Sequence, residues 1–264
     1  MSNSFPFNNM RVRFAGETDI GKTHAENEDS IYLPEMMPLG IVADGMGGAA
    51  AGEVASKLTV TIISDFFKKT SEGWHPIWPL HMDPLKYNIF RMESAITLAN
   101  ARVHRQSKDD ASCKNMGTTV VTIFFENSYC ILSHVGDSRV YRIRKDGLEL
   151  MLEDHSYVNE IARMRHITRE EAAAIGTKTN VVTRVIGPNP QIRPDTTVVY
   201  PQEDDLFILC SDGLNDMISD EQIFQIGTET EDLDEMCEKM IAAANEAGGE
   251  DNITVIAVRI EKEE

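Results

Sequence analysis

Three apolar segments of this 264-residue chain each end in an aspartate at a turn that contains glycine. The three are Asp44, Asp137 and Asp212, and a fourth, Asp251, directly precedes the apolar segment 253–260. Segments that are apolar throughout are typical of strands buried on both faces. A carboxylate at the end of such a strand is costly to desolvate unless a cation or a donor meets it. The pattern therefore indicates a hard-cation site where these strand ends converge.

Each aspartate taken singly also fits a tight turn, because Asp-Gly is a common hairpin dipeptide. Asp44 and Asp212 favour the site, since a helical pattern and not a returning strand follows each of them. Asp137 precedes a strand, so the turn alternative keeps more weight there. Oxygen ligands suit Mg²⁺ or Mn²⁺, and the scattered histidines offer no zinc spacing. Without metal, clustered carboxylates would repel one another; with two ions, a shared water becomes a hydroxide nucleophile.

The elements that must position these aspartates follow from hydrophobic periodicity. Helices are expected at about 50–69, with Val54, Leu58, Ile62 and Phe66 on one stripe, and at about 85–106. A third helix is expected at 157–165, and a fourth begins after a capping box that starts at Thr168. A fifth is expected from 233 to the glycines at 248–249. Strands are expected at 11–17, 31–33, 39–43, 118–125, 129–135, 140–144, 196–200, 206–210 and 253–260. This order indicates a single α+β domain with helices packed on antiparallel sheets.

Composition narrows the class of protein. Hydrophobic residues make up 42% and charged residues 26%, which is typical of a folded globular chain and not of a disordered one. The net charge of −18 argues against binding to nucleic acid or to an anionic membrane. The four cysteines contain no C-x-x-C pair, so we expect reduced core thiols and a cytoplasmic location. Residues 1–9 lack a signal-peptide pattern, and no apolar segment is long enough to span a membrane.

Seven short motifs occur in an order that carries a family resemblance. They are Asn27-Glu28-Asp29, Asp44-Gly45-Met46-Gly47-Gly48, Gly117-Thr118-Thr119, Gly136-Asp137-Ser138-Arg139, Val182-Thr183-Arg184-Val185-Ile186-Gly187, Ser211-Asp212-Gly213-Leu214 and Gly249-Glu250-Asp251-Asn252-Ile253-Thr254. Together they resemble the PP2C-like (PPM) metal-dependent serine/threonine protein phosphatases, and the bacterial branch most of all. The resemblance implies a four-layer αββα sandwich formed by one domain, residues 1–264, with residues 155–180 as a flap subdomain beside the site.

The same resemblance implies a site with two Mn²⁺ or Mg²⁺ ions and a more weakly held third. Asp44 would bridge the two ions, and Gly45 would offer its carbonyl to one of them. Glu28 would orient metal-bound water or bind metal at the inner rim of the site. The implied metal-ligand set is Asp29, Asp44, Gly45, Asp137, Asp212 and Asp251, with Asp137 assigned to the third ion.

Two positions depart from the family pattern. His24 stands where the family usually has an arginine that clamps the substrate phosphate, and imidazole lacks the planar, permanently charged fork of guanidinium. Either Lys22 or Lys178 could substitute, or His24 could donate a single hydrogen bond. Met46 stands where eukaryotic members have a histidine that is proposed as general acid, and bacterial members commonly carry methionine there.

The expected function is hydrolysis of phosphoserine and phosphothreonine by a hydroxide that bridges two ions, with Asp44, Asp212, Asp251 and His24 as the catalytic set. Two alternatives stay open. One is a catalytically weak PPM-like module that binds phosphoproteins, for which His24 is the argument; the other is a hydrolase of small phosphate esters. The expected partner is a phosphorylated protein, such as a Ser/Thr kinase or its targets, and we expect a monomer.

Overall fold

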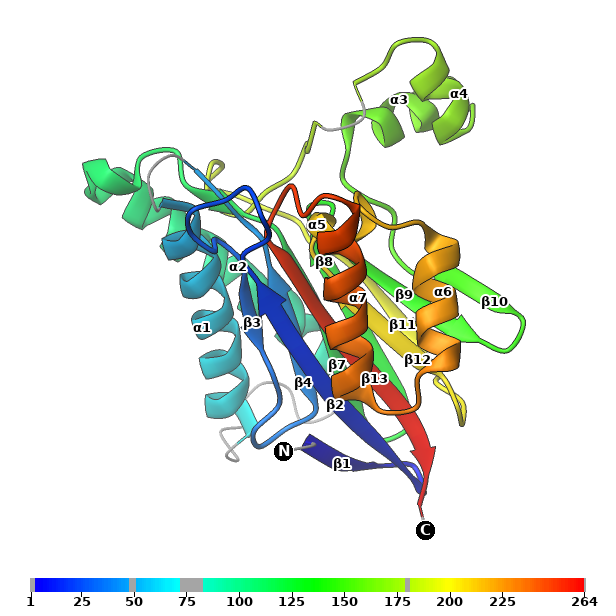
Figure 1. Cartoon of the computed structure of the whole chain (residues 1–264). Coiled ribbons are helices and arrows are strands. Elements are labelled where there is room, and N and C mark those ends of the chain that lie inside the picture. The colour runs from blue at the N-terminus through cyan, green and yellow to red at the C-terminus, as the bar shows by residue number, and fades with distance from the viewer. Residues whose placement is uncertain (1–2, 48–50, 72–82, 179–180, 264) are drawn as a thin grey trace.

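Two antiparallel sheets stacked face to face form the centre of the molecule (Figure 1). The computed structural model describes residues 3–47, 51–71, 83–178 and 181–263. Gly48 and the loop with Trp74 and Trp78 lie outside the described residues, so the role of that loop stays open.

Six strands form the first sheet and five form the second, and the pairings between neighbouring described strands are antiparallel. The first sheet has the order β1 (Asn3–Phe7), β2 (Met10–Asp19), β13 (Ile253–Lys262), β12 (Leu206–Cys210), β9 (Arg139–Arg144) and β10 (Gly147–Leu150). The second has the order β11 (Asp195–Val199), β8 (Tyr129–Val135), β7 (Val120–Glu126), β4 (Leu39–Ala43) and β3 (Ser30–Tyr32). A short ribbon of β5 (Gly45–Met46) and β6 (Gly117–Thr118) lies apart from both.

Aromatic side chains fill the space between the two sheets. Phe125 of β7 packs edge-on against Phe14 of β2, with ring centroids 5.8 Å apart, and against Phe207 of β12 at 6.2 Å. All three side chains are buried. This inner layer explains why the strands read as apolar throughout, because a helix layer covers the other face of each sheet.

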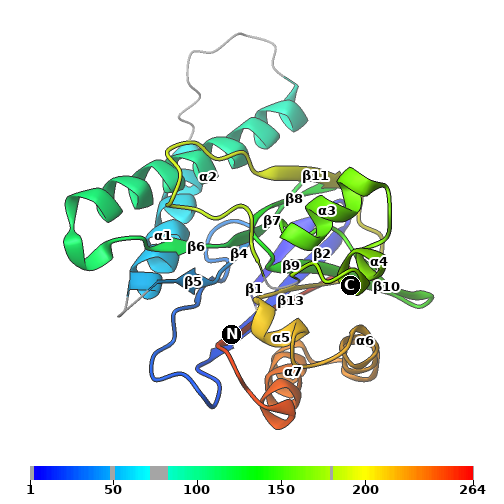
Figure 2. The same ribbon diagram turned by 90° about the horizontal axis from the view of Figure 1, so that it is seen from above.

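Helices cover the outer faces of the sandwich, as the view from above shows (Figure 2). On the five-stranded sheet lie α1 (Ala51–Ser71) and α2 (Pro84–Asp109), which share a core with β4, β7 and β8. On the six-stranded sheet lie α5 (Asp212–Asn215), α6 (Asp220–Glu229) and α7 (Leu233–Ala247). The predicted αββα sandwich is therefore confirmed.

The buried stripe of α1 differs from the predicted one by a single position. Ala55, Ile63 and Phe67 are fully buried, whereas Val54 is 38% exposed and its predicted partners at 58, 62 and 66 are partly buried at the edge of the core. The buried stripe and the predicted stripe both have a four-residue spacing. The buried stripe contains Ala55 and Thr59, which are less apolar than the valine and leucine at positions 54 and 58 of the predicted stripe. Hydrophobicity therefore pointed to the flank of the helix and not to the centre of its buried face.

Two helices stand away from the sandwich and form their own small core (Figure 1). They are α3 (Tyr157–Arg165), which Ser156 caps, and α4 (Arg169–Ala174), where Thr168 and Glu171 form the predicted capping box. One 3₁₀ turn, η1 (Ala111–Cys113), follows α2. Among the described helices, none has both the length and the apolar character that crossing a bilayer requires.

Candidate metal centre

Four strand ends, drawn from both sheets, meet at one edge of the sandwich. Asp44 follows β4, Asp137 connects β8 to β9, Asp212 follows β12, and Asp251 comes two residues before β13. All four carboxylates line a cavity of about 270 Å³. The structure thus brings together residues that lie more than 200 positions apart in the chain.

Asp44 is held in place through its backbone. Its carbonyl oxygen accepts hydrogen bonds from Thr118 Oγ1 and from the backbone N–H of Thr119, both at 2.8 Å. Its own N–H donates to Thr119 Oγ1 at 3.1 Å. Because Thr119 Oγ1 also lies 2.6 Å from Ser138 Oγ, the same hydroxyl links Asp44 to the turn that carries Asp137.

Gly45, next to Asp44, is required by the close approach of other backbone atoms. A Cβ at this position would lie 2.3 Å from the carbonyl oxygen of Gly52 and 2.5 Å from that of Glu28. Glu28 lines the cavity, and a backbone hydrogen bond from Gly52, near the start of α1, reaches its carboxylate. Any larger residue in place of Gly45 would force the cavity wall apart.

Asn252 fixes the N-terminal loop against the site beside Asp251. Its Oδ1 accepts the Glu28 N–H at 2.8 Å, and its Nδ2 donates to the carbonyl oxygens of Ile20 and Glu26. Its backbone N–H donates to Asp251 Oδ1 at 2.7 Å. The side-chain amide of Asn252 therefore holds the loop, and its backbone N–H holds the Asp251 carboxylate.

Asp29 lies behind the cavity wall and not on it. Its Oδ2 accepts hydrogen bonds from Ser211 Oγ at 2.7 Å and from Thr254 Oγ1 at 2.6 Å. Burial raises the pKa of Asp29 to about 6, although both hydroxyl donors lower it. In this geometry Asp29 anchors Ser211, the residue directly before Asp212.

The acids of the cavity work against one another electrostatically. Burial raises the pKa of Asp44 well above its ordinary value, and the neighbouring carboxylates Asp29, Asp212, Asp251 and Asp137 raise it further. The pKa of Asp212 rises to about 7, through burial first and then through Asp137 and Asp251. The pKa of Asp137 rises to about 6, mainly through burial. Carboxylates clustered in this way must either stay partly protonated or bind cations.

The donor set fits a hard divalent cation. The lining includes these four carboxylates and that of Glu28, and carboxylate oxygens are ligands that Mg²⁺ and Mn²⁺ prefer. Within the ranges that the structure describes, no three His, Cys, Asp or Glu side chains are grouped tightly enough to enclose an ion. The carboxylates share one cavity but would have to turn further inward around a cation.

A family model described as Protein phosphatase 2C matches residues 22–254. The chain belongs to the protein phosphatase 2C family. It is 34% identical over 252 residues to the serine/threonine phosphatase stp of Listeria monocytogenes, an alignment that covers 91% of this chain and 93% of that protein. The predicted family and enzyme class, a protein phosphatase, are therefore confirmed.

Solved structures of this family share the fold. The serine/threonine phosphatase of S. agalactiae is 33% identical, with a TM-score of 0.81 over 95% of this chain and 100% of that one. The catalytic domain of the phosphatase PstP in complex with two manganese ions is 30% identical, with a TM-score of 0.78 over 95% of this chain and 98% of that one. Metal dependence is thus supported for the fold.

His24, at the position for which the family resemblance implies a phosphate-clamping arginine, lines the cavity. Its Nε2 lies 3.3 Å from Asp251 Oδ1, and both side chains are about half-exposed. Among the described lining residues, His24 has the only basic side chain. Lys22 and Lys178, the predicted substitutes, are exposed and do not line the cavity, whereas Met46 does.

Several residues that shape this PP2C site had no assigned role in the sequence analysis. Thr119, Ser211, Asn252 and Thr254 all lie inside the family motifs, yet their roles are hydrogen bonds to partners distant in sequence. A polar residue directly next to a candidate ligand is a sequence signal for Ser211 and Asn252, which flank Asp212 and Asp251, whereas Thr119 and Thr254 carry no such signal.

Proposed function

We propose that this PP2C-family protein hydrolyses phosphoserine and phosphothreonine monoesters in protein substrates, using two divalent ions. The observation that carries the proposal is the convergence of Asp44, Asp137, Asp212 and Asp251 on one cavity. The serine/threonine phosphatases among its relatives support the substrate class. Two bound ions would supply the hydroxide nucleophile and neutralise the phosphoryl oxygens.

The residues of the cavity have separate roles in this proposal. Asp44 would bridge the two ions with help from the Gly45 carbonyl, and Asp212 and Asp251 would hold the other side of the pair. Asp137 would hold a third ion, and Glu28 would orient water. Whether Asp29 also binds metal stays a prediction, and its two hydroxyl donors favour an anchoring role.

His24 would donate one hydrogen bond to the substrate phosphate, in place of a bidentate clamp. Met46 lines the cavity but cannot transfer a proton, so it offers only apolar contact. We further propose that residues 1–264 form one domain with residues 155–180 as a flap beside the site, since Val182, just after it, lines the cavity. The cytoplasmic location, the monomeric state and a kinase or its targets as partner stay predictions.

The decisive experiment measures phosphate release from a phosphothreonine peptide as Mn²⁺ is added. We expect activity in the wild type and its loss in Asp44→Asn, while Asp109→Asn, at the exposed end of α2, serves as the matched control and keeps it. Peptide binding without turnover in the wild type would favour the binding module. Turnover of p-nitrophenyl phosphate but of no phosphopeptide would favour the small-ester hydrolase.

A further inference from the structure

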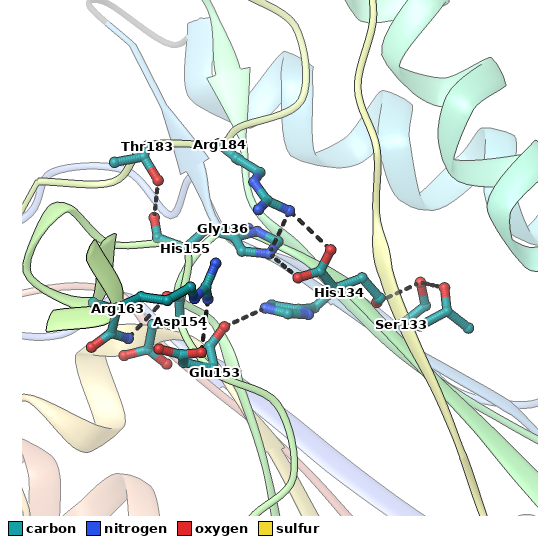
Figure 3. Close-up of polar contacts among 12 residues, drawn as sticks. Ser133, His134, Gly136, Glu153, Asp154, His155, Arg163, Thr183 and Arg184 are labelled. Carbon is teal, nitrogen blue, oxygen red and sulfur yellow. Dashed lines mark hydrogen bonds and ion pairs between the residues drawn. The ribbon is translucent and has the colours of Figure 1, made fainter. Parts of the chain in front are cut away.

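His155 lies at the joint between the core of the sandwich and the flap (Figure 3). Its backbone N–H donates to the carbonyl oxygen of Gly136 at 2.8 Å. Its own carbonyl oxygen accepts from the N–H of Thr183 at 2.8 Å and from Thr183 Oγ1 at 3.1 Å. One residue therefore connects the start of the flap, its return at Thr183, and the turn that leads into Asp137.

The imidazole ring makes a second contact with the same glycine. The backbone N–H of Gly136 donates to His155 Nδ1 at 3.1 Å, so Nδ1 must carry a lone pair. The ring proton is then on Nε2, which donates to Asp195 Oδ2 at 3.1 Å. Arg184 Nη1 also lies 3.1 Å from Nε2, but a protonated Nε2 cannot accept its hydrogen. Arg184 instead donates to Asp195 Oδ1 at 2.9 Å and orients that carboxylate.

The surroundings keep the ring of His155 neutral. It stacks on His134, with centroids 4.2 Å apart and planes 22° apart, and the two residues are 3% and 1% exposed. Burial, followed by the neighbouring His134, lowers the pKa of His155 to about 4, although the hydrogen bond to Asp195 raises it. His134 is itself fixed by the carbonyl oxygen of Glu153, 3.0 Å from its Nε2. Nδ1 therefore remains an acceptor at neutral pH.

Contacts with Thr119 and His155 restrict the backbone conformation of Gly136. Its φ of +114° favours glycine, and a Cβ there would lie 2.6 Å from Thr119 Cβ. Its N–H and its carbonyl both bond to His155, and the next residue, Asp137, lines the cavity. The direction in which Asp137 leaves this turn thus depends on the ring of a residue 18 positions later.

We propose that His155 is a positioning residue that fixes Asp137 in the cavity by binding both polar groups of Gly136, and that ties the return of the flap to the same turn. The proposal rests on the proposed function of the cavity as a metal site. It assigns His155 no contact with substrate. Loss of a group that orients a ligand typically weakens metal affinity by about 10- to 100-fold.

Two amide substitutions separate the two nitrogens of the ring. In His155→Asn the amide oxygen can replace Nδ1 as acceptor for the Gly136 N–H, whereas in His155→Gln the amide lies where Nε2 was. Mn²⁺ binding is measured by calorimetry, and the Mn²⁺ dependence of phosphate release is measured in parallel. Arg163→Ala, which removes an exposed ion pair with Glu153 on the flap, is the matched control.

We expect His155→Gln to weaken the weakest Mn²⁺ site by about 10-fold or more, with kcat largely restored at saturating Mn²⁺. His155→Asn and Arg163→Ala should bind Mn²⁺ as the wild type does. Equal weakening in both amide variants, or none in His155→Gln, would overturn the proposal. If the wild type released no phosphate, calorimetry would still decide the role of His155, so the two proposals fail separately.

The wild-type protein decides the matter if the variants do not fold. Slow exchange of the Gly136 amide, together with imidazole ¹⁵N shifts typical of an unprotonated Nδ1 and a protonated Nε2 in His155, supports the proposal. Fast exchange of that amide, or a proton on Nδ1, overturns it.

Discussion

The Nε2 atom of His24 lies 3.3 Å from Oδ1 of Asp251, so the residue predicted to meet the substrate phosphate contacts a candidate metal ligand. The family resemblance of the sequence implies an arginine at this position, whose fork would bind two phosphate oxygens at once. Here a half-exposed imidazole that lines the cavity has Nε2 next to Asp251.

His24→Arg should therefore strengthen substrate binding. A charge-assisted hydrogen bond contributes about 1.5–3 kcal/mol, and we expect KM for a phosphothreonine peptide to fall by about 10-fold. The value of kcat should change little, because none of the candidate metal ligands is substituted. Steady-state kinetics at fixed Mn²⁺ check this, with His24→Ala as the control that lowers affinity. An unchanged KM in His24→Arg would refute the missing-clamp interpretation.

The neutral, buried ring of His155 predicts that acid destabilises the protein. Its folded-state pKa of about 4 lies below the ordinary value of 6.5, so the unfolded chain binds more protons between these two values. Stability from this residue is present above pH 6.5 and is lost as the pH falls towards 4, by about 2 kcal/mol between pH 7 and 5. Urea unfolding at several pH values measures it. The pH slope in that window should be smaller in His155→Asn; an identical slope would contradict the assignment.

Asp205 should be important for stability and not for catalysis. It is 1% exposed and accepts from Arg144 Nε at 2.5 Å and Nη2 at 2.9 Å. Asp205→Ala removes the carboxylate that accepts from the Arg144 guanidinium, which is 30% exposed, and from the Gln202 N–H, and should lower the free energy of unfolding by about 2–3 kcal/mol. Arg163→Ala breaks an exposed pair and should cost about 1 kcal/mol or less. Similar losses in the two variants would show that burial of the Asp205 carboxylate is irrelevant.

Gly136 and Gly176 offer a matched pair of glycines with positive φ, at +114° and +84°. A Cβ at Gly136 would overlap Thr119, whereas a Cβ at Gly176 would meet nothing within 4 Å. Gly176→Ala should cost about 1–2 kcal/mol of backbone strain. Gly136→Ala adds steric overlap and should cost about 2 kcal/mol more. Equilibrium unfolding compares them, and equal costs would mean that the contact with Thr119 relaxes freely.

Added Mn²⁺ should raise the melting temperature of the wild type. A ligand present at 100 times its dissociation constant stabilises the folded state by about 2.7 kcal/mol. Asp44→Asn should lose most of this shift, and the metal-free variant should be at least as stable as the metal-free wild type, because one repelling carboxylate is gone. Calorimetric melts with and without Mn²⁺ give both quantities. A full Mn²⁺ shift in Asp44→Asn would place the ions elsewhere.

The sequence by itself determined the candidate site and the layers around it. Aspartates at the ends of apolar strands and helices with four-residue spacing are local patterns, which can be read without coordinates, whereas the four-layer arrangement was implied by the family resemblance of seven short motifs. The capping box at Thr168 and the end of α7 at the glycines 248–249 were predicted for the same reason. Where two neighbouring stripes were both plausible, as on α1, the more apolar stripe was chosen and the buried one was missed.

Tertiary structure decided the contacts between residues far apart in the chain. The hydroxyls that hold Asp29 come from positions 182 and 225 residues away, and His24 meets Asp251 only because β13 returns beside β2. The bond between Gly136 and His155 has no periodic signal at all. Such pairings depend on how the two sheets stack and on which backbone groups burial leaves without partners, and these are properties of the whole fold.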